Sequence, residues 1–202
     1  LQAQINPHFL YNTLDTINWM AHKEGMDTIS KMVASVSNLM RISISNKKQF
    51  VTVEDEIQYV EEYLYIQQIR YKDKLYTSIN LDDSIRKQII PKLILQPIVE
   101  NAVVHGIENS KKPGKVQLTG VRTGNIIRFT VTDTGIGIPQ ERLSTLLSLS
   151  HAEEGKNDPH SHLGLYTVHR RLRHLYGEEY GLRVHSKAGK GTEVLIENPY
   201  DK

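Results

Sequence analysis

An acidic residue stands at the end of one strand-like stretch, in a position where it could bind a ligand. Ile127 and Val131 alternate with polar residues, and the same alternation places Asp133 on the face that packs against the core. A carboxylate there could accept a hydrogen bond from an exocyclic amine. Gly135 and Gly137 follow directly and allow the backbone to approach a flat or charged ligand closely. The alternative is an ordinary Asp-Thr-Gly turn at a strand end.

A second group of polar residues lies on a helix that the sequence predicts from Pro91 to about Gly106. Asn101 and His105 are one turn apart on the same face, and Glu100 is their neighbour. An amide oxygen suits magnesium, which keeps most of its water and binds few protein ligands beside phosphates. Asn101 could instead be a buried amide whose hydrogen bonds are satisfied within the protein.

A third candidate is the start of a helix predicted for residues 163–176, where Gly164 and Leu165 stand. The free amides of a helix N-terminus favour phosphate, although a single glycine before a helix is common. The polar run before it, residues 150–162, is long enough to be a mobile lid, because loops of that length in compact domains are usually functional or disordered.

The candidate nucleophile is His8. It follows Pro7 inside an amphipathic periodicity, and a proline there removes a backbone hydrogen bond and bends the helix. A neutral imidazole is a competent nucleophile toward a phosphoryl group, and Asn12, one turn on, could orient it. A structural or merely exposed histidine is the alternative, and we interpret the other histidines in that way. His105 is the partial exception, because it shares a face with Asn101.

The elements that carry His8 form a helical hairpin. Apolar residues recur at three- and four-residue steps from residue 1 to about 24, where Gly25 ends the first helix, and again from Asp27 to about Ser45. Two helices this short bury too little apolar surface to be stable alone, so pairing with a second copy would supply the missing core. The polar joint at residues 46–49 marks the predicted boundary between a domain at residues 1–47 and a domain at residues 48–202.

The second domain mixes helices and strands. Thr52 with Asp55 and Glu56 predicts a capped helix that runs to about Tyr71. Strands are predicted at residues 75–81, 116–121, 126–132, 182–186 and 192–196, with a turn at residues 122–125 and another around Gly189 and Gly191. Helices on one face of a mainly antiparallel sheet give an α+β fold, here an α/β sandwich.

Composition excludes several classes of function. The 202 residues carry a formal net charge of +2, which gives no reason to expect nucleic acid or an anionic membrane as partner. There is no cysteine, so disulfides, thiolate metal sites and cysteine nucleophiles are excluded. No apolar run approaches the roughly 18 residues that span a bilayer, and we therefore expect a soluble chain, which opens so abruptly at Leu1 that we interpret it as part of a longer protein.

Four segments together resemble a known ATP-binding domain. LQPIVENAVVHG at residues 95–106 resembles an asparagine box, DTGIGIP at residues 133–139 a first glycine box, and LGLYTVHRRLRHLYG at residues 163–177 a second one, while residues 189–192 match a further glycine turn. The pattern is that of the Bergerat or GHKL domain shared by sensor histidine kinases, gyrase-type ATPases and Hsp90-like chaperones. QINPHFLYN at residues 4–12 is similar to the phosphoacceptor box of LytS/YesM-like sensor histidine kinases, and FVTVEDEIQYVEEYLYIQQIRY at residues 50–71 also matches that family.

The resemblance implies an ATP-dependent autokinase. His8 would attack the γ-phosphorus of ATP, Glu100 would polarise a proton or water nearby, and Asn101 would hold Mg2+. The phosphohistidine would pass its phosphoryl group to an aspartate of a response regulator receiver domain. The nucleotide contacts implied are Asn101, His105, Asp133, Gly135, Gly137, Gly164, Leu165 and Thr192.

The resemblance also implies an assembly and a location. The N-terminal hairpins would form a four-helix bundle in a homodimer. The chain would be the cytoplasmic part of a membrane-bound bacterial sensor, with membrane and sensing segments before Leu1.

Four positions depart from the family pattern. Phe9 stands where many histidine kinases have an acidic residue, Val104 where relatives often have a basic one, His162 where a glycine is usual and Thr167 where asparagine is frequent. Three of them, Val104, His162 and Thr167, keep open the alternative of a dimeric scaffold that binds nucleotide without turning it over. A second alternative is an ATPase or protein serine kinase with the same nucleotide fold. The segment at residues 4–12 argues against the second.

Overall fold

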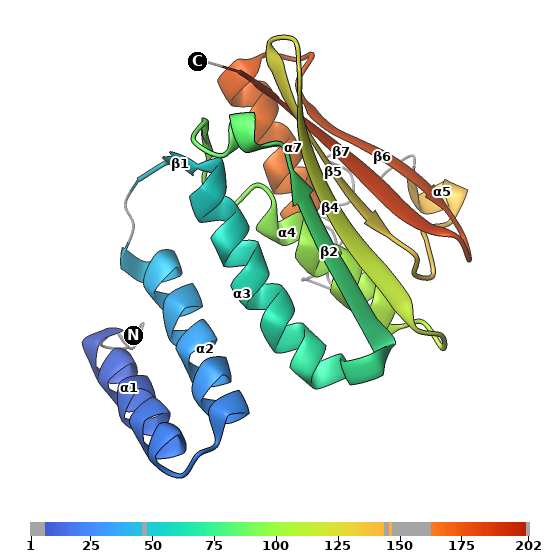
Figure 1. Ribbon diagram of the computed structural model, residues 1–202. Coiled ribbons are helices and arrows are strands. Elements are labelled where there is room, and N and C mark those ends of the chain that lie inside the picture. Colours follow the sequence, from blue (N-terminus) through green and yellow to red (C-terminus); the bar gives the residue numbers. More distant parts are fainter. Residues whose placement is uncertain (1–6, 46–47, 144–145, 147–162, 201–202) are drawn as a thin grey trace, which may run out of the picture.

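The computed structural model describes residues 7–45, 48–143, 146 and 163–200. In these residues an N-terminal helical hairpin is followed by an α/β sandwich, so the predicted fold class is confirmed (Figure 1). Some sequence predictions lie outside the described residues: the helical periodicity before Pro7, part of the polar joint at residues 46–47, and the lid at residues 150–162 with His162. The exact domain boundary stays a prediction.

The hairpin consists of α1, Pro7–Lys23, and α2, Asp27–Ser45, with Gly25 at φ +67° in the connection. Both helices were predicted, and a positive φ is the conformation that glycine supplies without strain. Ser30 Oγ donates to Asn18 Oδ1 at 2.6 Å and fastens the two helices together near the turn. Large apolar side chains on this hairpin remain exposed: Phe9, Ile17, Trp19, Met20, Met26 and Ile29.

Helix α3, Val53–Tyr71, connects the hairpin to the sandwich, and it begins with a complete capping box. Asp55 N donates to Thr52 Oγ1, and Thr52 N donates to Asp55 Oδ2, both at 3.1 Å, so two amides that have no helical partner are satisfied. This start was predicted from the residues. The hairpin packs on α3 through α2, where Asn38 Nδ2 donates to Glu62 Oε1 at 3.0 Å.

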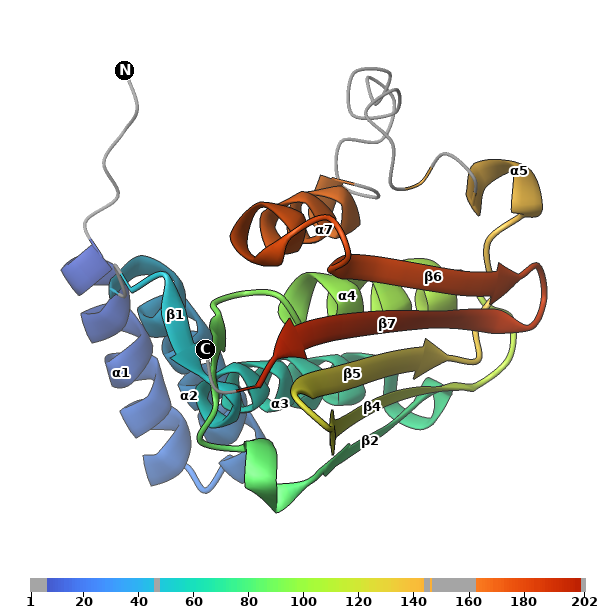
Figure 2. The same ribbon diagram turned by 90° about the horizontal axis from the view of Figure 1, so that it is seen from above.

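The sandwich is built on a five-stranded sheet in the order β2-β4-β5-β7-β6. Only the β2–β4 pair is parallel, and the other neighbours are antiparallel. Helices α3, α4 (Gln96–Asn101) and α7 (Leu163–Tyr176) lie on one face of this sheet (Figure 2). The strands are β2 (Leu75–Leu81), β4 (Gly114–Thr123), β5 (Ile126–Asp133), β6 (Gly181–Lys187) and β7 (Gly191–Pro199).

The predicted alternation in β5 is confirmed. Ile127, Phe129 and Val131 are buried on the helix-facing side, and Asp133 continues the same series with only 8% of its surface exposed. Strand side chains alternate between faces, so the carboxylate is carried to the helix-facing side by the pattern that builds the core.

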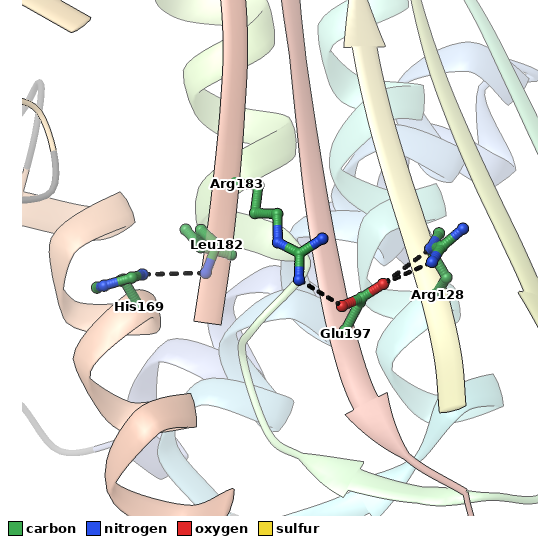
Figure 3. A network of polar contacts seen from close by, with 5 residues as sticks. All are labelled: Arg128, His169, Leu182, Arg183 and Glu197. Carbon is green, nitrogen blue, oxygen red and sulfur yellow. Dashed lines mark hydrogen bonds and ion pairs between the residues drawn. The ribbon is translucent and has the colours of Figure 1, made fainter. Parts of the chain in front are cut away.

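Polar contacts join α7 to β6 and join strands β5, β6 and β7 to one another (Figure 3). His169 on α7, Leu163–Tyr176, accepts a hydrogen bond at Nδ1 from the backbone amide of Leu182 at 3.0 Å. Burial lowers the pKa of this imidazole, and the nearby Arg173 lowers it further. On the sheet, Glu197 accepts from Arg128 at 2.7 Å and pairs with Arg183 at 3.3 Å, so three strands share one carboxylate.

The predicted helix start at Pro91 is wrong. Pro91 closes β3, Ile89–Pro91, which pairs antiparallel with β1, Phe50–Thr52, and helix α4 begins at Gln96. Pro97, not Pro91, occupies the first turn, where the fixed φ of proline suits a helix start. The helix runs as α4, Gln96–Asn101, and then as a π-helix, η3, Ala102–Glu108, which the sequence did not indicate.

Short elements complete the chain: η1 (Lys72–Lys74), η2 (Asp83–Ile85) and α5 (Gln140–Leu143). None of the helices in the described ranges has the length and apolar character needed to cross a bilayer.

Candidate functional site

A cavity of about 600 Å³ lies between the sheet and the helices. That volume is in the range of small-molecule and cofactor sites. Its described lining comes from α4, η3, the end of β5 with the turn after it, α5, α7 and β7, and the lining residues relevant to binding are Asn101, His105, Asn109, Asp133, Gly137, Ile138, Arg142, Leu165 and Thr192.

Asp133 is the buried charge of this cavity. Its Oδ1 accepts a hydrogen bond from Gly135 N at 2.8 Å, which is the contact of the Asp-Thr-Gly turn expected as the alternative. The interpretation as a turn residue and the interpretation as a ligand-binding residue are therefore compatible, because the same carboxylate also lines the cavity. Burial raises its pKa to about 6, although hydrogen bonds from Gly135 and Thr192 act in the opposite direction. Burial deprives this carboxylate of hydrogen bonds from solvent, so a hydrogen-bond donor of a ligand that enters the cavity would bind it favourably.

Glycines let the π-helix touch the turn after β5. Ile136 N donates to the Gly106 carbonyl at 3.1 Å, and a Cβ on Gly135 would lie 2.2 Å from that same carbonyl oxygen. Gly137 has φ +66°, and a Cβ there would lie 2.1 Å from the Lys187 carbonyl oxygen. Close backbone approach is thus the reason for both glycines of the predicted box. Gly137 lines the cavity, whereas Gly135 is not among the lining residues and packs against Gly106 of η3.

Asn101 and His105, the two helix residues singled out from the sequence, both line the cavity. Asn101 Nδ2 donates to the Pro97 carbonyl at 2.6 Å. This contact holds the amide nitrogen against the helix and leaves Oδ1 as the acceptor that the half-buried side chain can offer to a ligand.

Glu100 and Gly164 line a neighbouring groove of about 550 Å³ rather than the cavity itself. The groove shares Asn101 and His105 with the cavity, so the two spaces adjoin along η3. Glu100 Oε1 accepts from Gln96 Nε2 at 2.5 Å. Burial raises the pKa of Tyr63 in the same groove, and the nearby Glu100 carboxylate raises it further.

The helix that follows the lid contributes through its first turn. Leu165 is buried and lines the same cavity as Asp133. Thr192 also lines it, and its hydroxyl lies 2.9 Å from Ser186 Oγ, which in turn donates to the Gly191 carbonyl at 2.9 Å. The predicted glycine turn therefore fixes the orientation of Thr192.

His8 lies apart from this cavity. It is exposed on α1, and Asn12 Nδ2 lies 3.2 Å from its Nδ1, which is the orienting contact expected of Asn12. None of the described residues of α1 and α2 lines the cavity. The structure thus brings together Asn101, His105 and Asp133, and it leaves the candidate nucleophile on a separate unit.

Sequence reasoning missed two residues of the cavity wall. Asn109 lines both the cavity and the groove, and the signal for it was the four-residue spacing of Asn101, His105 and Asn109. Arg142 lines the cavity from α5, and no pattern in the sequence pointed to it. Of the departures from the family pattern, Val104 lines only the groove and Thr167 is exposed.

Two family models match the chain in succession. The first, described as histidine kinase, matches residues 1–75, and the second, described as histidine kinase-, DNA gyrase B-, and HSP90-like ATPase, matches residues 87–202.

The curated relatives are sensor proteins. Sensor histidine kinase YesM of Bacillus subtilis is 38% identical over 98% of this chain, sensor histidine kinase YpdA of Escherichia coli is 34% identical over 98%, and sensor protein LytS of Staphylococcus saprophyticus is 31% identical over 99%. The chain spans about a third of the length of each relative, 32% of YesM and 33% of the other two.

Solved structures share the fold. The histidine kinase domain of the blue-light activated histidine kinase EL346 from Erythrobacter litoralis gives a TM-score of 0.53 at 19% identity, with 95% of each chain covered. Full-length ShkA, solved in complex with AMPPNP, gives 0.57 at 17% identity, covering 96% of this chain and 44% of that one. The catalytic domain of histidine kinase ThkA gives 0.56 at 19%, covering 74% and 93%.

Proposed function

The chain belongs to the sensor histidine kinase family, and from that premise we propose that it transfers the γ-phosphoryl group of ATP to His8 of its own homodimer. The observation that carries the proposal is the buried carboxylate of Asp133 inside a cavity of about 600 Å³ that also contains Asn101 and His105. A buried acceptor surrounded by apolar walls suits the adenine of ATP, whose ring is flat and whose exocyclic amine is a donor.

In this proposal the adenine amine donates to Asp133, and the phosphates extend toward η3 and the first turn of α7. Asn101 and His105 lie where the cavity and the groove adjoin, so we assign the γ-phosphate to that junction. The groove then offers the open side from which a nucleophile approaches, and Glu100 lines it.

The residues present fit magnesium. Asn101 offers an amide oxygen because its Nδ2 is held by the Pro97 carbonyl. In the part of the chain that the structure describes, no three acidic or histidine side chains gather into a metal site. A single amide oxygen, that of Asn101, suits Mg2+, which takes few protein ligands and completes its shell with water and phosphate oxygens. When bound, Mg2+ would neutralise charge on the phosphates.

The contact with Asn12 orients the imidazole of His8. Asn12 Nδ2 faces Nδ1 at 3.2 Å, and an amide nitrogen only donates, so Nδ1 accepts and the ring proton lies on Nε2. Once that proton is removed, Nε2 attacks the γ-phosphorus in line, the new N–P bond forms as the bond to the bridging oxygen breaks, and ADP leaves with that electron pair. We assign Glu100, which lines the groove together with Asn101, to accept the displaced imidazole proton.

The exposed apolar residues of α1 and α2 support a homodimer. Phe9 and Trp19 are 67% and 64% exposed, which is costly for side chains of that size unless a second copy covers them. A four-helix bundle would do so. We further propose that an aspartate of a response regulator receiver domain accepts the phosphoryl group, and that the whole protein holds this region on the cytoplasmic side of a membrane.

Radiolabelled ATP tests the activity. The chain should acquire a γ-phosphate label that is acid-labile and base-stable, as expected of phosphohistidine, and His8→Gln should abolish it with ATP affinity nearly unchanged. His22→Gln is the matched control, because His22 is an exposed histidine in the last turn of the same helix. Undiminished label in His8→Gln, or an acid-stable label, would refute the assignment and favour a nucleotide-binding scaffold or an ATPase.

A further inference from the structure

A buried lysine joins the ATP-binding domain to the end of the hairpin. Lys92, between β3 and α4, is only 6% exposed, and its Nζ donates to the Ile42 carbonyl at 2.5 Å. Ile42 lies in the last turn of α2, whose carbonyls have no helical amide left to bind. A cation at a helix C-terminus is also favoured by the helix dipole. Lys92 therefore acts as the C-terminal cap of a helix that belongs to the other domain.

An arginine from α7 binds at the same junction. One terminal nitrogen of Arg171 donates to the carbonyl of Lys92, and the other donates to the carbonyl of Gln49 at 2.9 Å. Gln49 directly precedes β1, in the connection between the hairpin and the sandwich, and its carbonyl also accepts from Lys92 N at 3.0 Å. The planar fork of a guanidinium is suited to reaching two carbonyls at once.

The segment that carries Lys92 is held in an unusual conformation. Leu93 has φ +60°, which a residue with a Cβ adopts only at a cost. Glu56 maintains it: the carboxylate is 2% exposed, Oε2 accepts from Leu93 N at 2.7 Å and Oε1 accepts from Leu95 N at 3.1 Å. Desolvation raises the pKa of this carboxyl group, against the effect of its backbone hydrogen bonds. Lys92 therefore lies directly before a turn whose conformation is fixed by Glu56.

Helix α7 reaches both the cavity and this junction. Leu165 in its first turn lines the cavity, and Arg171 stands six residues later on the same helix. At the rise of an α-helix that separation is about 9 Å. On the hairpin side, α2 and α3 lie between α1 and the sheet (Figure 1). The arrangement that the junction holds therefore keeps His8 away from the cavity of its own chain.

We propose that Lys92 and Arg171 form a clasp that holds the hairpin in a resting position, and that this clasp must open before His8 is phosphorylated. The inference rests on the autokinase activity proposed above. Both are positioning residues, because neither lines the cavity. They act through Ile42 and Gln49 on the orientation of α2, and hence on the distance that His8 must cover.

Three variants test the clasp in the full chain. Arg171→Ala removes the fork, and Lys92→Met removes the donor to Ile42 while it keeps a long apolar stem in the buried position. Arg170→Ala is the matched control, because Arg170 is the next arginine on α7, is exposed and lies over the Tyr166 ring. Hydrogen–deuterium exchange of residues 48–52 and the initial rate of autophosphorylation against ATP concentration are measured for each.

Lys92→Met should raise the maximal autophosphorylation rate by roughly tenfold, the scale set by losing one hydrogen bond to a charged group, and Arg171→Ala, which loses two, should raise it by at least as much. The KM for ATP should stay within about twofold of the parent, since no cavity residue is changed. Exchange of residues 48–52 should become faster. Arg170→Ala should change none of these quantities.

Other outcomes overturn the proposal. A maximal rate that falls at constant KM would mean that the clasp builds the transferring geometry instead of a resting one, and an unchanged rate would mean that its opening controls nothing. Unchanged exchange in both variants would mean that the contacts do not restrain the connection. If Arg171→Ala fails to fold in a thermal melt, Lys92→Met decides alone. Absence of phosphohistidine from every protein, the parent included, would instead refute the autokinase activity, and the exchange data would still report on the clasp.

Discussion

The pH dependence of ATP binding is the sharpest test of the adenine assignment. If the exocyclic amine donates to Asp133, ATP binds the ionised carboxylate and competes with a proton for it. Burial raises the pKa of this group to about 6, well within the range where binding is measurable. With that pKa, displacement of the proton weakens binding about 1.1-fold at pH 7 and about 11-fold at pH 5. We therefore expect affinity to fall about tenfold between these two pH values.

Asp133→Asn should remove this component and weaken binding at pH 7 by on the order of 1–3 kcal/mol, the cost of a poorly matched buried hydrogen-bond partner. The terminal phosphate of ATP titrates in the same range. The difference between the parent and the variant cancels this contribution. Calorimetric titration from pH 5 to pH 8 measures it. Equal pH slopes for the two proteins, or parental affinity in Asp133→Asn, would show that the amine does not bind Asp133.

The same substitution should act on stability with the opposite sign. The pKa of Asp133 is raised in the folded chain, so its contribution to stability is fully present below pH 3.8 and is lost as pH rises through about 6. Without nucleotide at pH 7 to 8, Asp133→Asn should therefore raise the free energy of unfolding, by on the order of 1–3 kcal/mol. Chemical denaturation checks this, and a less stable variant would mean that the ionised carboxylate has a compensating partner.

Three further results are expected. Gly135→Ala should lower the melting temperature by several degrees and abolish ATP binding, because the new Cβ would stand 2.2 Å from the Gly106 carbonyl; unaltered binding would mean that the turn can move away from η3. A truncated chain that starts at Gln49 should sediment as a monomer, and a dimer would place the interface outside the hairpin. Glu197→Gln should cost only about 1 kcal/mol in urea unfolding, because its partner Arg128 has 41% of its side chain exposed, and a cost several times larger would mean that this carboxylate is more than a surface partner.

Local signals predicted the elements well where a short pattern determines the structure. The capping box at Thr52 and the alternation that ends at Asp133 each depend on residues within a few positions, and both are confirmed. The family is also confirmed, and the glycine and asparagine boxes that carried the resemblance are local motifs. These features depend on local sequence and not on how the two domains are placed relative to each other.

The helix start shows where local reasoning fails. Pro91 and Pro97 both precede apolar periodicity, and sequence alone gave no reason to prefer the second. What decides between them is Glu56, on α3, whose carboxylate binds the amides of Leu93 and Leu95. A contact across 37 positions of chain holds the segment before Gln96 out of the helix. Helix propensity depends on local sequence, so it gives no indication of a tertiary contact such as the one made by Glu56.

The π-helix follows from the same kind of cause. The Gly106 carbonyl accepts from Ile136 N across the cavity wall, and this contact requires the helix to approach the turn after β5. With 3.6 residues per turn, each four-residue step would rotate a side chain by about 40°, and Asn109 would drift away from Asn101. The wider i→i+5 winding changes that offset, and Asn101, His105 and Asn109 all line one cavity. The four-residue spacing of these polar residues is thus visible in the sequence, whereas the wider winding is not, because the contact between Gly106 and the turn after β5 is tertiary.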